Sequence, residues 1–196
     1  MFLFLGLGER LTRYPRTLSG GEGNDYLYDL GGTDYSRLSG DDGNDILEIK
    51  EGSGAVDLMG GAGNDLLKGG QGPNSLEGGD GNDVVIGGGQ RDTIVGGSGS
   101  DYIEAGGGND QINGGAGSDY MRGGAGADDY IFDAGSFGTD LISDDGGSLS
   151  LVGGGSLSGG TYQAKSLAFE AEGYEYRKFQ IGDFSALMIN AKGDEK

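Results

Sequence analysis

The sequence repeats every nine residues from Gly60 to Ile131, where eight units follow one another without an inserted or deleted residue. Four of them read GGAGNDLLK, GGDGNDVVI, GGSGSDYIE and GGAGSDYMR, so the shared pattern is Gly-Gly-x-Gly-x-Asp-x-U-x, in which U is a large apolar residue. A unit this short cannot bury its own apolar residue, so the units must stack on one another. The period therefore predicts a stacked repeat and not a globular domain.

Weaker copies of the unit extend the repeat in both directions. One further unit follows Ile131, and four precede Gly60, where two inserted pairs at 38–39 and 49–50 interrupt the register: the added units begin at Gly20, Asp29, Gly40, Glu51 and Gly135. In this register the U place is apolar in every unit except one, which has Ser36. We expect Leu38 to replace it through a bulge.

The row of U residues predicts one short strand per unit, with its middle residue pointing inward. A six-residue turn is too short to connect neighbouring parallel strands of one sheet. The conflict disappears if successive units belong to opposite sheets and each unit pairs with the next but one. We therefore predict an all-β fold, a right-handed parallel β-roll of two sheets with about 18 residues per turn.

The ends of the chain have a different composition from the repeats. We expect residues 1–19 to form an N-terminal leader, whose apolar start is too short to cross a bilayer, lacks the features of a cleaved signal, and supplies a strand that covers the first turn. Residues 20–143 form the roll. We expect residues 144–196, rich in β-branched and aromatic residues, to form a β-rich C-terminal cap that covers the unpaired edges of the last turn.

Charge and composition exclude several functions. The net charge is −19, and most of it lies in residues 20–131, which argues against nucleic acid or anionic lipid as a partner. The chain has no Cys and no His, and it contains neither a G-x-S-x-G nor a GK[ST] motif, so we expect no catalytic site in it. Cations are the natural partner, and we expect a monomer.

The Gly-Gly-x-Gly-x-Asp turn has the chemistry of a cation site. Glycine permits positive φ and leaves the backbone carbonyls unshielded, and carbonyls alternate in direction along an extended turn. Each turn can therefore direct some oxygens to the turn below and others to the turn above, with the aspartate between them. Six to eight oxygens suit calcium better than the smaller, water-retaining magnesium.

These units resemble the calcium-binding nonapeptide repeats of the repeats-in-toxin (RTX) family. The resemblance implies that calcium lies between turns on the same side of the roll. Carbonyls at positions 2 and 4 and the aspartate come from one turn, and carbonyls at positions 1 and 3 and the aspartate come from the next. The implied carbonyl donors are Gly61, Gly63, Gly78 and Asp80; Gly79, Gly81, Gly96 and Ser98; Gly97, Gly99, Gly114 and Ala116; and, on the other side, Gly106, Gly108, Gly123 and Ala125.

The two sides of the roll differ in their position-6 residues. The first edge has an aspartate in every unit: Asp25, Asp45, Asp65, Asp83, Asp101, Asp119 and Asp140. The second edge has Asp34, Val56, Asn74, Asp92, Asp110 and Asp128 in this register. We expect up to about six calcium ions on the first edge, with the two sites of 20-residue spacing less secure. On the second edge we expect about two, Asp92/Asp110 and Asp110/Asp128, which makes about eight in all, within a range of about six to nine. A further site at Asn74/Asp92 is doubtful, because Gln90 also replaces the position-4 glycine.

The resemblance implies a secreted module that leaves the cell unfolded through a type I secretion apparatus and folds on calcium outside. Two alternatives stay open. The chain could be the C-terminal module of an RTX protease, lipase or hemolysin whose catalytic domain lies in a separate part of the protein. It could also be an adhesive or ice-binding roll, although positions 7 and 9 carry Tyr, Leu, Val, Lys, Glu and Arg instead of the flat row of Thr or Asn that this requires.

Overall fold

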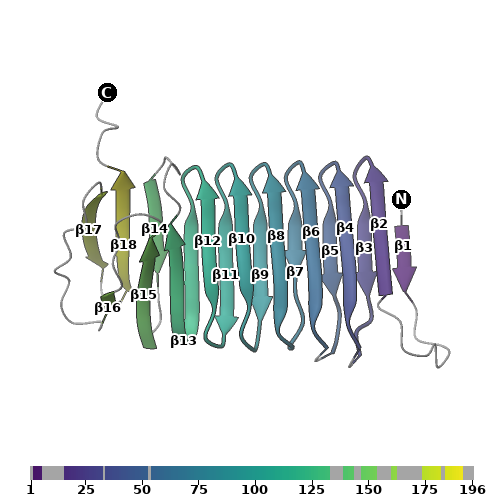
Figure 1. The fold of residues 1–196 in the computed structure, drawn as a ribbon. Helices are drawn as coiled ribbons and strands as arrows, with labels where there is room; N and C mark the ends of the chain where they lie inside the picture. Colours follow the sequence, from purple (N-terminus) through teal and green to yellow (C-terminus); the bar gives the residue numbers. More distant parts are fainter. Residues whose placement is uncertain are drawn as a thin grey trace.

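The chain winds into a flattened coil of two stacked sheets. Strand β1 lies at one end of the coil, and the strands β14–β18 lie at the other (Figure 1). The computed structural model describes residues 2–5, 16–32, 34–52, 54–132, 139–143, 147–153, 160–162, 174–181 and 184–191. Every regular element in these residues is a strand. The described residues contain no helix of the length and hydropathy that a membrane span requires.

Successive strands alternate between the two sheets. Sheet A contains β1 (Phe2–Leu5), β3 (Tyr26–Asp29), β5 (Ile46–Ile49), β7 (Leu66–Lys68), β9 (Val84–Gly88), β11 (Tyr102–Gly107), β14 (Thr139–Ser143), β17 (Tyr174–Ile181) and β18 (Phe184–Ala191). Sheet B contains β2 (Arg16–Glu22), β4 (Ser36–Asp42), β6 (Val56–Ala62), β8 (Asn74–Asp80), β10 (Thr93–Ser98), β12 (Gln111–Ala116), β15 (Gly147–Gly153) and β16 (Gly160–Tyr162). The long strand β13 (Tyr120–Phe132) pairs with β11 through its first half and with β12 through its second.

From β1 to β15 each strand pairs in parallel with the strand one turn of the coil away. In the regular part the partners are 18 residues apart, as for Leu67 and Val85, and in the N-terminal part they are 20 apart, as for Leu27 and Leu47. This pairing is the one that the nine-residue period predicts, and the parallel β-roll is confirmed.

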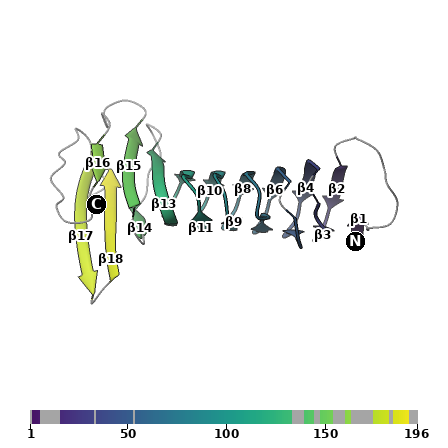
Figure 2. The same ribbon diagram turned by 90° about the horizontal axis from the view of Figure 1, so that it is seen from below.

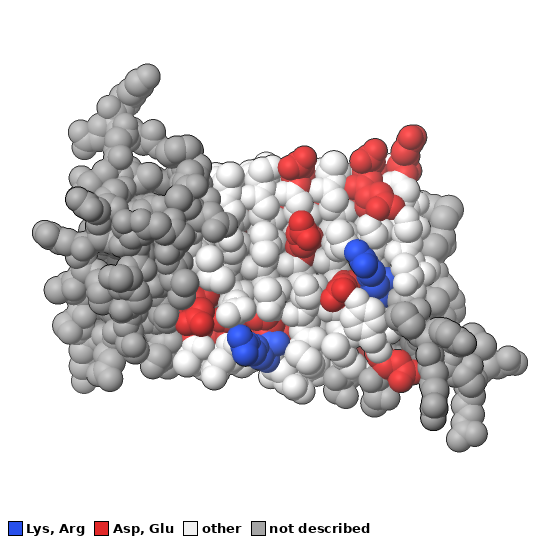
Figure 3. Space-filling view, viewed as in Figure 1, with Lys and Arg blue, Asp and Glu red and all other residues white. Residues whose placement is uncertain are grey.

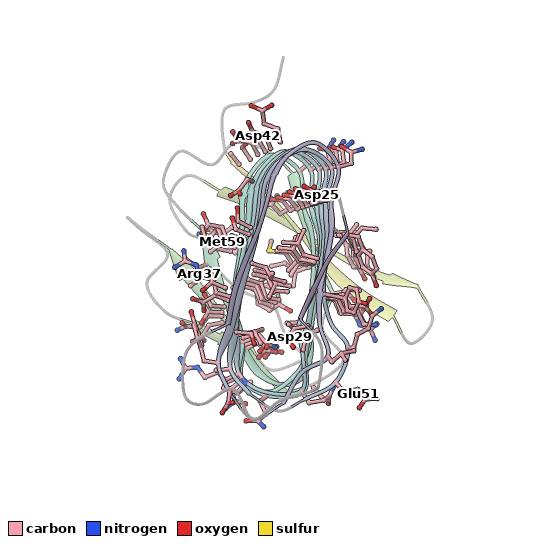
Figure 4. The ribbon with its side chains drawn as sticks, turned by 90° about the vertical axis from the view of Figure 1, so that its right-hand side faces the viewer. Asp25, Asp29, Arg37, Asp42, Glu51 and Met59 are labelled. Atoms are coloured by element: carbon pink, nitrogen blue, oxygen red, sulfur yellow. The ribbon has the colours of Figure 1, made fainter. Side chains whose placement is uncertain are left out.

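The core is a double row of apolar side chains between the sheets. One row comes from sheet A and includes Leu47, Val85 and Ile103. The facing row from sheet B includes Leu58 and Ile112, and all of these side chains are fully buried. Viewed along the coil, the two rows fill the interior of a flat oval (Figure 4). Because each unit supplies one large apolar residue, the core has the same width throughout.

Leu38 fills the core place that the nine-residue register assigns to Ser36. It pairs with Leu58 and is fully buried, whereas Ser36 pairs with Val56 two residues earlier in the strand. The expected replacement of Ser36 by Leu38 is therefore confirmed. Its cause is a longer preceding turn and not a bulge within the strand, as the second-edge geometry below shows.

Beyond the repeats the pairing changes from parallel to antiparallel. β14 pairs with β13 in parallel and with β18 antiparallel, and β17 and β18 form an antiparallel pair. β16 adds antiparallel to β15 (Figure 2). These strands cover sheet edges that the last turn would otherwise expose. At the other end β1 pairs in parallel with β3. Residues 163–173 of the expected cap lie outside the described residues.

Candidate metal centres

The turns that lead from sheet B to sheet A form the first edge, and each places an aspartate just inside the coil. Asp25 marks this row in Figure 4, and Asp29 lies inside at the opposite, second edge. All seven first-edge aspartates are at most 9% exposed. Carboxylates are seldom buried to this degree unless a charged partner or a metal accompanies them.

From Asp45 onward, one oxygen of each first-edge carboxylate is held by the preceding turn. The backbone N–H of Asp25 donates to Asp45 Oδ1 at 2.7 Å, and the same bond recurs turn after turn, ending with Asp119 N–H and Asp140 Oδ1 at 3.0 Å. The bond fixes the side-chain rotamer, so every carboxylate presents its second oxygen in the same direction.

In eight aspartates of the two edges the second oxygen, Oδ2, is buried and has no hydrogen-bond partner among the described residues: Asp45, Asp65, Asp83, Asp92, Asp101, Asp110, Asp119 and Asp128. Buried polar atoms nearly always have a partner, and an unpaired one costs about 1–3 kcal/mol, or more when charged. Eight at regular intervals indicate a missing positive partner between the turns.

The carbonyl of position 1 in the following turn points to the same spot. A Cβ built on Gly60 would lie 2.4 Å from both Asp65 Oδ2 and Gly78 O, and one on Gly78 would lie 2.4 Å from Asp83 Oδ2 and 2.5 Å from Gly96 O. In these turns the glycine at position 1 lies between the two oxygens, whereas the turn of Asp110 on the second edge has Ala105 at this position.

Carbonyls of positions 2 and 4 point the opposite way, to the following turn. A Cβ on Gly79 would lie 2.0 Å from Gly61 O, and one on Gly81 would lie 1.9 Å from Gly63 O; both of these upper glycines have positive φ, 116° and 133°. The position-3 carbonyl points back again, since Asp80 O accepts the N–H of Gly63 at 2.7 Å. Backbone oxygens from both turns therefore face the space beside each orphaned carboxylate oxygen.

Burial raises the pKa of these carboxyls. Desolvation is the main cause throughout, and the neighbouring carboxylates often add to it. The pKa rises to about 6 for Asp65, Asp101 and Asp110 and to about 7 for Asp92 and Asp140. The pKa is also raised for Asp45, Asp83, Asp119 and Asp128. The fold thus makes ionised carboxylates unfavourable unless a cation accompanies them.

The second edge repeats this geometry only in its C-terminal half. Asp92 N–H donates to Asp110 Oδ1 at 2.8 Å, and Asp110 N–H donates to Asp128 Oδ1 at 3.0 Å. A Cβ on Gly87 would lie 2.5 Å from Asp92 Oδ2 and 2.3 Å from Ala105 O, as at the first edge.

These repeats match a known family. The family model of the RTX calcium-binding nonapeptide repeat (4 copies) covers residues 17–47, 59–94 and 95–130, more than half of the chain. The chain belongs to the RTX family. No curated protein and no solved structure matches the chain.

The donor set fits the calcium that RTX repeats bind. No group of three or more His, Cys, Asp or Glu side chains in the described residues is arranged to hold a metal ion, so a site here depends mainly on backbone carbonyls. Two aspartates and up to four carbonyls, all oxygens, match a hard cation with six or more ligands. For the pair Asp119/Asp140 the upper turn lies in residues 133–138, outside the described residues.

One expectation about the second edge is wrong. The RTX register places Asp34 in the aspartate row, but Asp34 is exposed, and the residue paired with Val56 and, one turn further, Asn74 is Ser36. The strands pair Asp29 with Ile49, so the turns from Asp29 to Ser36 and from Ile49 to Val56 are each two residues longer than the turn from Gly87 to Asp92. Both inserted pairs therefore lie in second-edge turns and not at 38–39 and 49–50.

The first edge is unaffected by these insertions. The turns Gly20–Asp25, Gly40–Asp45 and Gly60–Asp65 have equal lengths, and the N–H bonds to Asp45 and Asp65 Oδ1 are both 2.7 Å. The 20-residue spacing there reflects the longer turn on the opposite edge. It gives no reason to separate the first two RTX sites from the others.

Sequence reasoning missed a ladder of asparagines outside the aspartate row. At position 5, Asn24 Oδ1 accepts the N–H of Asn44 at 2.9 Å, and the pattern continues through Asn64 and Asn82 to the N–H of Ser100. The same bond joins Asn109 to the N–H of Ala127 on the second edge. Acidic side chains lie further out, where β2, β4 and β8 end at the rim (Figure 3). The recurrence of Asn before Asp in the units was the available signal.

Proposed function

We propose that calcium folds this chain by binding between successive turns, and that the chain serves as the calcium-dependent folding module of a secreted protein. The observation that carries the proposal is the row of buried Oδ2 atoms without partners, repeated at the spacing of the turns and facing backbone carbonyls. Each ion would neutralise two carboxylates and join two turns, so binding energy becomes folding energy.

Repulsion between the aspartates is large enough to oppose folding without a cation. Aspartates about 5 Å apart repel by about 0.8 kcal/mol per neighbouring pair at the dielectric constant of water, and by several times more in a partly buried turn. An ordinary domain is stable by only about 5–15 kcal/mol. The summed repulsion along two edges is comparable, so the calcium-free chain should be largely disordered.

The proposed sites are about six between the seven first-edge aspartates and about two on the second edge, at Asp92/Asp110 and Asp110/Asp128. In each, positions 2 and 4 of the lower turn and positions 1 and 3 of the upper turn supply carbonyl oxygens. For the pairs Asp65/Asp83, Asp83/Asp101, Asp101/Asp119 and Asp110/Asp128 these are the carbonyls named in the sequence analysis. Ala105 at position 1 supplies its carbonyl to the first of the second-edge sites.

Calcium-dependent folding fits a chain that works outside the cell. Cytosolic calcium is scarce and extracellular calcium is plentiful, and members of the RTX family leave the cell unfolded through type I systems. We infer the same route for this chain, with the secretion apparatus as a transient partner and a monomeric folded product. In this account the roll itself is structural, and an enzymatic or toxic activity would reside in another part of a longer protein.

A comparison of circular dichroism in millimolar calcium and in chelator tests the proposal. We expect strand signal to appear with calcium and to be largely lost in chelator, with magnesium at the same concentration much less effective. Isothermal titration should count about eight ions. Equal strand content in chelator and in calcium would contradict the proposal.

A further inference from the structure

The second edge contains a turn in which an amide stands in the aspartate row. A Cβ on Gly69 would lie 2.8 Å from Asn74 Nδ2 and 2.6 Å from Gly87 O. One turn later a Cβ on Gly87 lies 2.5 Å from Asp92 Oδ2 and 2.3 Å from the next position-1 carbonyl. Asn74 Nδ2 therefore lies where the other turns have the orphaned carboxylate oxygen.

This nitrogen contacts three oxygens of the kinds that face a calcium site. It donates to Asp92 Oδ1 at 2.8 Å, to Gly70 O at 3.2 Å and, more weakly, to Gly87 O at 3.5 Å. These are the aspartate of the following turn, the position-2 carbonyl of the same turn and the position-1 carbonyl of the following turn. With the amide turned over, its own oxygen would face all three acceptors.

We propose that the side-chain amide of Asn74 performs the work of a calcium ion between the turns Gly69–Asn74 and Gly87–Asp92, so that the metal row of the second edge begins only at Asp92/Asp110. The inference rests on the proposed function, because it assigns one pair of turns to a group other than calcium. The amide brings positive N–H dipoles to the oxygens without a carboxylate charge that needs compensation.

The two preceding turns are also closed without a carboxylate facing a gap. In the turn directly before Asn74's, Ile49 stands at position 1 and Val56 at position 6. Both side chains are buried, at 5% and 3% exposed, and they fill the gap with apolar groups. One turn earlier, the fully buried Asp29 accepts a short hydrogen bond from Ser36 Oγ and another from Gly31 N–H at 2.9 Å. Three successive turns thus lack the calcium geometry, and Asn74 lies at the boundary with the turns that have it.

Substitution of Asn74 by aspartate tests the proposal. Asn74→Asp restores the missing oxygen beside Gly87 O, Gly70 O and Asp92, so the variant should bind one more calcium ion per chain than the wild type by isothermal titration. Asn64→Asp is the matched control, since it adds the same charge at an exposed position whose Oδ1 already accepts the N–H of Asn82. We expect it to leave the ion count unchanged.

Asn74→Ala distinguishes two roles of the amide: it could take the place of a calcium ion, or its oxygen could bind one. If the amide replaces calcium, this variant keeps the wild-type ion count and unfolds at a lower temperature. The loss of one ion on Asn74→Ala would show that Asn74 is a ligand and would overturn the inference.

Anomalous diffraction from wild-type crystals grown in calcium gives a test that needs no variant. The inference requires no calcium peak between Asn74 and Asp92 and a peak between Asp92 and Asp110, and a peak in the first place would overturn it. A wild-type chain that binds no calcium at all would instead refute the proposed function.

Discussion

The two edges of the roll have the same strand register but differ in what holds their turns together. Along the first edge every turn from Asp25 to Asp140 presents a buried carboxylate, whereas the second edge changes from a hydrogen-bonded pair at Asp29 and Ser36, through an apolar pair, to the amide of Asn74 and then to carboxylates. The strands pair continuously through all of these turns. The strand pairing of the coil therefore does not depend on a carboxylate at every turn. It requires that the inward oxygens be satisfied or the gap be filled.

Under the proposed function, calcium dependence would be a local property of each pair of turns. In the proposed account a cation lies beside each buried carboxylate at position 6 that faces another carboxylate turn. Larger or donor-bearing groups at positions 1 and 6 fill this space directly, as Ile49 and Asn74 do. The four predictions below test this difference, beginning with the largest expected effect.

Acid should partly replace calcium wherever carboxylates line an edge. Burial raises the pKa of these carboxyls from 3.8 in the unfolded chain to about 6 for Asp65 and about 7 for Asp92 in the fold. Between these values the folded chain binds more protons than the unfolded chain, so the stability of the calcium-free roll falls as pH rises from about 4 to about 7. In chelator, circular dichroism should show strand content increasing as pH is lowered from 7.5 to about 4.5.

In calcium the dependence on pH should reverse, because the ion binds the deprotonated carboxylate and competes with the proton. The calcium concentration at half-folding should therefore increase as pH falls through about 7 to about 6. Sedimentation at each pH must show a monomer, since a loss of net charge also favours association. A calcium-free chain whose strand content stays constant or declines on acidification contradicts the prediction.

Removal of one aspartate should have different effects on the two edges. Asp83 faces carboxylate turns on both sides, so Asp83→Ala should remove about two ions and cost about 3–5 kcal/mol in calcium. Asp92 faces a carboxylate turn on one side and Asn74 on the other, so Asp92→Ala should remove only one. Isothermal titration and denaturant unfolding measure both effects.

Asp80→Ala is the control on the same turn as Asp83. Its side chain is exposed and accepts a hydrogen bond from Ser98 Oγ at 2.8 Å, and the substitution retains its backbone carbonyl. We expect an unchanged ion count. Equal ion losses for Asp83→Ala and Asp92→Ala would remove the proposed difference between the edges.

The roll and most of the aspartate row could be predicted from sequence because both depend on period alone. A fixed spacing of one apolar residue and one aspartate per unit determines which strands pair and which side chains share a row, as Leu67, Val85, Asp65 and Asp83 show. In these turns local sequence and stacking lead to the same register.

The second edge was harder to predict because a spacing of 20 residues does not say where the additional pair lies. Counting forward from the glycines predicts Asp34 in the aspartate row of the second edge. Reading backward from the buried leucines Leu38 and Leu58 gives Ser36 and Val56, which is the register of the structure. The burial of the core leucine fixes the strand, and the turn absorbs the extra length. The donor role of Asn74 depends on which way its amide faces, which spacing does not determine.

The apolar turn of the second edge should contribute stability that does not depend on metal. Ile49→Ala removes buried methylene groups beside Val56 and should cost about 2–4 kcal/mol. Ile46→Ala, on the same strand but 41% exposed, should cost less than about 0.5 kcal/mol. Denaturant unfolding in saturating calcium measures both, and titration should give the wild-type ion count for each. An ion lost on Ile49→Ala would mean that this turn contributes to a metal site.

The asparagine ladder should have a smaller effect, and the same one on both edges. Asn44 Oδ1 accepts the N–H of Asn64 at 2.7 Å, and Asn109 Oδ1 on the second edge accepts the N–H of Ala127 at 3.0 Å. Asn44→Ala and Asn109→Ala should each cost about 0.5–1.5 kcal/mol without loss of calcium. In Ser100→Ala the backbone N–H still donates to Asn82, so this control should change stability less than either.

Thermal unfolding of the three variants at one calcium concentration measures these costs. Similar values for Asn44→Ala and Asn109→Ala would mean that the outer ladder stabilises the turns of both edges alike. A cost confined to the first edge would mean that the ladder depends on something other than the aspartate row, because the turns of Asn44 and Asn109 both lie between carboxylate turns. The difference between the edges would then extend beyond the aspartate row to the outer surface of the turns.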